Sequence, residues 1–231
     1  MISLYLEALS GSLRFDPALA RRVRREVEDH LQQAVAADLA HRGAAAERRA
    51  IIAFGDAQII AGQFAAIWIA GQMKRFGIAL VLVIASVFVA MKGRVAWYAA
   101  MGGGAGHDAS AMATIVASID RYAFWLSVII GAGSFAYLVS RPLPAPAGAR
   151  YRKQLRCVLV SGAAAIAPLM LAVLSDGVLT AMPLLGADLR VASLVPLGTM
   201  AIEIACVGFL VFHFWVVRLR TRAATALLTS T

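Results

Sequence analysis

Four long apolar blocks, all located after Lys74, most constrain what this chain can fold into. They cover about residues 76–100, 122–139, 157–174 and 191–217. A helix needs roughly 17 to 25 mostly apolar residues to cross a bilayer. Of the 231 residues, 61% are hydrophobic and 15% are charged, whereas about a quarter are charged in an ordinary soluble domain. The sequence therefore predicts an all-α fold with a four-helix transmembrane bundle over residues 71–222.

The first 70 residues, by contrast, have the pattern of a small soluble helical domain. Asp16-Pro17 is a helix start signal, with aspartate as the cap and proline at the first helical position. Apolar residues then recur every four positions opposite a charged face: Phe15, Leu19, Val23, Val27, Leu31, Val35 and Leu39. This spacing predicts an amphipathic helix that ends near Gly43. Shorter helices are expected over residues 3–13 and 45–54, and a C-terminal tail over residues 223–231.

The segment Phe54-Gly55-Asp56 predicts the end of one helix and the start of the next. Glycine can adopt the left-handed conformation that closes many helices. Aspartate can accept hydrogen bonds from the free N–H groups of the following turn. Gly55 and Asp56 are therefore expected to be the hinge and the cap between the soluble domain and the first apolar helix, which runs to about Ala100.

Residues 25–64, REVEDHLQQAVAADLAHRGAAAERRAIIAFGDAQIIAGQF, resemble the HAAS or permease-prefix group of bacterial domains. That group has an acidic-then-His-Leu helix, a glycine-containing turn and a closing F/L-G-D-P-x-x-I-A motif. Here the motif covers residues 54–61, with Ala57 in place of the usual proline. The resemblance implies a cytoplasmic helical regulatory module in front of a membrane segment, and it carries over no catalytic residue. It also implies a sigma factor or a transporter subunit as the partner.

The basic residues indicate the orientation of the chain in the membrane. The net charge is +9, yet residues 1–75 hold ten basic against eight acidic residues. Five basic residues lie between the second and third blocks and three follow the fourth. The connector after the third block has one, and the one after the first has three when the uncharged core of that block is taken to end at Met91. The positive-inside rule then places both termini in the cytoplasm of a cell with an inner membrane. This distribution predicts the lipid bilayer, and no nucleic acid, as a partner.

The connectors between the blocks have their own signals. Gly102 to Asp108 is expected to be a flexible loop, and the alternating prolines of residues 142–146 a stiff linker. A short interfacial helix is expected near residues 178–185. Three carboxylates are expected either to line an acidic extracytoplasmic surface or to be solvated in loops: Asp120, Asp176 and Asp188.

Glu203 is the main candidate for an intramembrane polar site, because a carboxyl group inside an apolar block is costly. Cys206 and His213 lie on roughly the same helix face. Glu203 either couples to a proton or cation or binds a ligand, or it makes an interhelical bond or pairs with a basic residue such as Arg94 or Arg121. His213 is expected to be an interface residue, since a metal site on one helix needs ligands closer together.

A second candidate site is the charged face of the amphipathic helix. It comprises Arg21, Arg22, Arg24, Arg25 and Glu26. This face either contacts anionic lipid or a partner protein, or is a solvated surface on which nearby acidic residues neutralise the arginines.

The sequence favours no enzymatic chemistry. It contains no phosphate-binding loop and no zinc signature, and Cys157 and Cys206 lie inside apolar blocks, so no disulfide, metal or cofactor is expected. No cleavable signal peptide is expected either. Two functions stay open. One is a regulatory membrane protein with signalling or anti-sigma-like partner binding; the other is a small transporter component, in a homo-oligomer, that uses Glu203.

Overall fold

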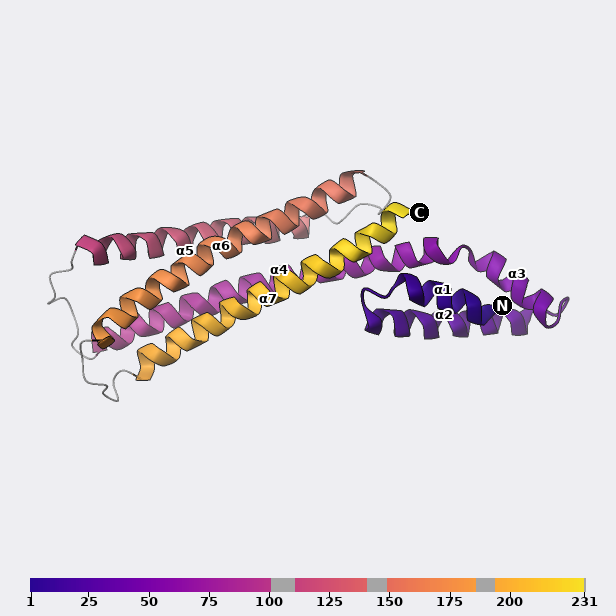
Figure 1. Cartoon of the computed structure of the whole chain (residues 1–231), viewed down its shortest axis with the longest axis horizontal. Coiled ribbons are helices and arrows are strands. Elements are labelled where there is room, and N and C mark those ends of the chain that lie inside the picture. Colours follow the sequence, from indigo (N-terminus) through magenta and orange to yellow (C-terminus); the bar gives the residue numbers. More distant parts are fainter. Residues whose placement is uncertain (101–110, 141–148, 186–193, 231) are drawn as a thin grey trace. The chain divides into compact units, whose positions relative to one another are not determined.

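The computed structural model describes residues 1–100, 111–140, 149–185 and 194–230, and confirms the predicted all-α class (Figure 1). These residues form seven helices and no strand. The glycine-rich loop and the proline linker that the sequence predicts lie outside the described residues, as does Asp188.

Three short helices come first: α1 (Ile2–Ser12), α2 (Pro17–Ala37) and α3 (Ala44–Phe54). The start of α2 is as predicted, because Asp16 Oδ1 accepts hydrogen bonds from the backbone N–H groups of the first turn at 3.0 and 3.2 Å. The helix ends at Ala37 rather than near Gly43. Asp38 turns the chain there, since its Oδ1 accepts from the N–H groups of residues 40 and 41. Leu39 is consequently 95% exposed instead of facing the core.

The joint after α3 has the predicted cap and an unusual backbone. Gly55 has φ of +105° and ψ of −175°, a region that is essentially open to glycine alone. Asp56 Oδ1 then accepts hydrogen bonds from the N–H groups of Gln58 at 2.7 Å and Ile59 at 3.3 Å. The chain therefore leaves α3 at Gly55 and starts the next helix at once.

Four long helices follow: α4 (Ala57–Ala100), α5 (Ala111–Ser140), α6 (Ala149–Leu185) and α7 (Leu194–Ser230). Each contains a stretch long and apolar enough to cross a membrane, so the chain is a multi-pass membrane protein. The helices extend beyond the predicted blocks. In α6 the helix runs without a break through residues 178–185, where a separate interfacial helix is predicted, and α7 stays helical to Ser230 rather than ending in a tail.

The described residues divide into two compact units, and α4 and α7 contribute to both. Of the described residues, the first unit comprises 1–72, 149–152 and 217–230. Its core combines the inward faces of α1, α2 and α3 with the first turns of α4, and Leu227 of α7 packs against it. The C-terminal end of α7 is thus part of the fold of the N-terminal helices.

The second unit comprises residues 73–142 and 153–216. Its apolar core takes residues from all four long helices, which makes it a four-helix bundle. Glycines allow two of the close approaches. A Cβ added at Gly131 of α5 would lie 2.8 Å from Ile84 of α4, and one at Gly162 of α6 would lie 2.7 Å from Phe76. Small residues at helix interfaces are typical of membrane bundles.

Candidate intramembrane charge cluster

Arg94 is buried in the second unit although its side chain carries a full charge. It lies six residues before the end of α4 and is 3% exposed. A charged group inside a membrane protein normally faces the interior of the bundle and is paired there. The surroundings of Arg94 therefore define the most polar site in the described part of the bundle.

The guanidinium of Arg94 contacts two other helices. Its Nη1 lies 2.5 Å from Asp176 Oδ2 and donates to Thr180 Oγ1 at 2.5 Å, both on α6. Its Nη2 pairs with Glu203 Oε1 of α7. Its Nε donates to Thr199 Oγ1 of α7 at 3.1 Å. One side chain of α4 thus connects α6 and α7 through two carboxylates and two hydroxyls.

α5 contributes a third carboxyl group. Asp120 is half-buried and interacts electrostatically with Asp176 and with Arg94, and also with its neighbour Arg121. Arg121 itself is exposed. We call Arg94, Asp120, Asp176 and Glu203 the charge cluster. Each of the four long helices contributes one of its members.

The carboxyl groups of the charge cluster outnumber its buried cation. Glu203 is 1% exposed, and its Oε2 has no hydrogen-bond partner among the described residues. Asp120 Oδ1 is also buried without a partner there. The carboxyl groups of Asp176 and Glu203 both contact the guanidinium of Arg94. A single guanidinium therefore pairs with two carboxyl groups and interacts electrostatically with a third, that of Asp120.

The structure brings Glu203 together with Arg94, but not with Cys206 or His213. Pairing with Arg94 was one of the alternatives and is the arrangement found. Cys206 instead packs against the apolar core. His213 stacks on Phe209 and Phe76, with ring centroids 5.8 and 6.2 Å away. The predicted trio of Glu203, Cys206 and His213 is thus not one site, because Cys206 and His213 have apolar and aromatic neighbours.

The predicted solvated loop was wrong for Asp120, which lies on α5 with one carboxyl oxygen buried, and the whole prediction was wrong for Asp176. It is neither a solvated loop residue nor part of an acidic surface, because α6 continues past it and directs it towards Arg94. A signal was present in the sequence, since Asp176 is the lone acidic residue between Cys157 and Leu185. The sequence does not say which helix would supply its partner.

No family model, no curated protein and no solved structure matches this chain. The resemblance of residues 25–64 to the permease-prefix group therefore stays a prediction.

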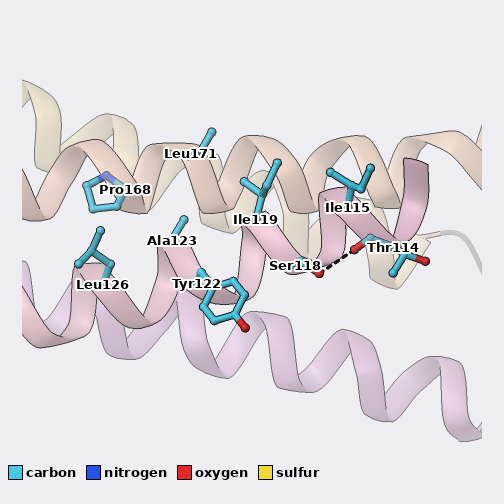
Figure 2. A pocket seen from close by; sticks show the side chains of 9 residues that line it. All are labelled: Thr114, Ile115, Ser118, Ile119, Tyr122, Ala123, Leu126, Pro168 and Leu171. Atoms are coloured by element: carbon cyan, nitrogen blue, oxygen red, sulfur yellow. Dashed lines mark hydrogen bonds between the residues drawn. The ribbon is translucent and has the colours of Figure 1, made fainter. Parts of the chain in front are cut away.

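Two grooves on the bundle are apolar. Figure 2 shows the first, of about 490 Å³, between α5 and α6. Apart from the hydroxyl groups of its threonine, serine and tyrosine, its walls are carbon: Thr114, Ile115, Ser118, Ile119, Tyr122, Ala123, Leu126, Pro168 and Leu171. The second, of about 520 Å³, lies between α6 and α7. Neither is lined by a member of the charge cluster, so both suit acyl chains rather than ions.

The first unit has a polar contact of its own at Asp16. Besides capping α2, Asp16 accepts a hydrogen bond at its Oδ2 from Trp68 Nε1 of α4 at 2.7 Å. Arg220 Nη1 of α7 lies 3.7 Å from the same oxygen. The predicted interface residues Arg21, Arg22, Arg24, Arg25 and Glu26 are all exposed on α2. They are placed to meet solvent or a partner, and they do not build the core.

Proposed function

We propose that this chain is a regulatory protein of the inner membrane whose first unit binds a cytoplasmic protein partner. The observation that carries the proposal is the contact of Asp16 with Trp68 of α4 and Arg220 of α7. It supports a unit built on the ends of two membrane-crossing helices, rather than a soluble domain on a loose tether. Such a unit can respond when α4 and α7 shift.

The proposed partner surface is the exposed face of α2. Its four arginines are exposed and lie between the buried positions of the same helix. The arginine side chains can therefore contact a partner while the opposite face of α2 stays packed in the core. A partner with a complementary acidic patch would be attracted and oriented by these charges. A sigma factor or a transporter subunit is the partner class that the sequence resemblance suggests.

The proposed orientation follows from charge. The basic flanks at Arg218, Arg220 and Arg222 and those around residues 150–156 favour the cytoplasm for both termini. An even number of spans is consistent with both ends on one side.

The test is site-specific crosslinking in the membranes of the native cell. A photoreactive residue at Arg24 should give a discrete protein adduct, whereas the same residue at lipid-facing Leu126, 51% exposed, should not. Replacing Arg21, Arg22 and Arg25 with glutamate should abolish the adduct. The matched control replaces Arg48 and Arg49, exposed on α3, in the same way. Equal adducts from the Arg24 and Leu126 positions would contradict the proposal.

A second candidate, a small transporter component, is favoured by one observation: the buried, unpartnered Oε2 of Glu203. It needs a polar path to the charge cluster, which the two apolar grooves do not supply. Ion or solute flux in liposomes that is lost in Glu203→Gln would support it over the regulatory function.

A further inference from the structure

The charge cluster has an imbalance that its own residues do not resolve. If all its groups were ionised, three carboxylates would surround one guanidinium and leave two negative charges inside the bundle. Uncompensated charge in such a place is strongly unfavourable. Arg121, which interacts electrostatically with Asp120, is exposed rather than enclosed with Glu203.

The placement of Glu203 and Asp176 on one guanidinium points to how the imbalance is relieved. Arg94 carries one positive charge and neutralises one ionised carboxylate, so a proton on the other carboxyl group removes the remaining charge of the pair. Both groups also contact Arg94, on different nitrogens. The free Oε2 of Glu203, in a residue only 1% exposed, is an acceptor or hydroxyl position that the described protein groups leave open.

We propose that the charge cluster is a proton-binding site that holds at least one exchangeable proton at neutral pH, on Glu203 or on Asp176. Charged groups from all four packed helices set its occupancy. Arg94 of α4 favours the ionised carboxyl groups, Asp120 of α5 favours a bound proton, and Asp176 of α6 and Glu203 of α7 compete for it.

A proton suits the site better than a metal ion does. The described residues include no group of three His, Cys, Asp or Glu side chains arranged to hold a metal. Arg94 already occupies the space between the two principal carboxyl groups, and its positive charge repels a second cation. Among small cations, a proton alone can be accommodated within the existing hydrogen bonds.

This inference does not depend on partner binding by the first unit. The experiment is infrared difference spectroscopy of the full-length protein in nanodiscs of uncharged lipid. Protonated carboxyl groups absorb apart from ionised ones and shift on exchange into D₂O. The wild type should show such a band at pH 7, and the band should disappear as the pH is raised. Glu203→Gln should remove or strongly reduce it, and Asp176→Asn should alter it.

The control is Glu26→Gln, which removes a carboxyl group exposed on α2 and should leave the band unchanged. A wild type without the band at pH 7 would overturn the proposal without reference to any variant. The proposal is equally wrong if the band appears only when Na⁺ and K⁺ are replaced by choline, because a metal cation would then neutralise the cluster. Failure of the crosslinking test at Arg24 would leave this result untouched.

Discussion

Asp16 makes two kinds of contact with one carboxylate. One oxygen caps α2 and the other accepts the indole N–H of Trp68. Because each carboxylate oxygen accepts from a different helix, the residue fixes the start of α2 against α4. Phe15 supports the same contact, since its ring lies 5.1 Å from that of Trp68 in an edge-to-face arrangement.

Replacing Trp68 with phenylalanine should keep this ring contact and lose the hydrogen bond. Hydrogen bonds to charged groups contribute about 1.5–3 kcal/mol, so the first unit should be destabilised by roughly that amount. The effect is measured by heating the full-length protein in detergent micelles and using the cleavage of residues 1–72 by a protease to detect the unfolding of the first unit. Trp215→Phe is the control, because Trp215 is 57% exposed on the bundle. Equal melting of both variants would show that the Asp16 contact contributes nothing.

Gly55 gives a second prediction at this scale. Its positive φ strains any other residue, although an added Cβ would meet nothing within 4 Å. Gly55→Val should therefore destabilise the first unit by about 1–3 kcal/mol through the backbone alone, while the membrane helices still insert. Gly11→Ala, also in open space but inside α1, should instead stabilise by about 0.5–1 kcal/mol. A Gly55→Val protein as stable as the wild type would refute the backbone argument.

Helices α4 and α5 pack through glycine. Gly131→Leu should force α5 away from Ile84 and lower the melting temperature of the bundle, because overpacking costs about 1–3 kcal/mol. Gly133→Leu, two residues along the same helix in open space, should have little effect. Comparable losses in both variants would mean that the close approach of α4 and α5 is not what the glycine provides.

The link between α1 and α3 should depend on pH. The N-terminal ammonium of Met1 donates to Glu47 Oε2 at 2.9 Å, and the Ile2 N–H donates at 3.3 Å. These bonds, led by the one to the ammonium, hold the pKa of Glu47 below its usual 4.5. Because the folded pKa is lowered, the contribution to stability is present above the unfolded pKa and is lost as the pH falls through the folded one.

The measurement is the urea midpoint of the wild type and of Glu47→Gln. The wild type should have the higher midpoint at neutral pH, and the difference should vanish in strong acid. Glu7→Gln, which changes an exposed carboxyl group on α1, should show no such pH-dependent difference. A constant gap between wild type and Glu47→Gln at all pH values would contradict the assignment.

At the element scale, the starts of the helices were more predictable than their ends. Asp16-Pro17 and Asp56 are local signals, and both caps form as expected. The arginines after Val217 do limit an apolar block, but arginine is a good helix former, so α7 continues through them. The arginines in the sequence indicate where the apolar, lipid-contacting part of α7 ends. The end of the helix itself depends on the packing of α7 in the first unit.

The charge cluster was only partly predictable for a related reason. Glu203 stands out because its neighbours in sequence are apolar. Its partners Arg94 and Asp176 are far away along the chain, and helical periodicity does not say which faces of two helices meet. Asp38 is a local example of the same difficulty. Its side chain ends α2 at Ala37, although the apolar spacing in the sequence continues to Leu39.

For the whole molecule, the charge distribution predicts which side of the membrane each segment faces. In a chain with Cys157→Ser and Cys206→Ser, a cysteine at Glu26 should resist a membrane-impermeant thiol reagent in intact cells and react after lysis. A cysteine at His107, between the first two spans, should react in intact cells. The reverse labelling pattern would place the first unit outside the cell and exclude a cytoplasmic partner.

The charge cluster also sets a condition on how the chain is made. Arg94 enters the membrane with α4, before any of its acidic partners has been synthesised. A lone arginine costs about 2.5–3.5 kcal/mol at the centre of a span on insertion scales and less towards its end, where Arg94 lies; the compensating carboxylates arrive with α6 and α7. A chain that stops before α6 keeps Arg94 without Asp176 and Glu203. That unmatched charge distinguishes an unfinished protein from a finished one at the ribosome and the translocon.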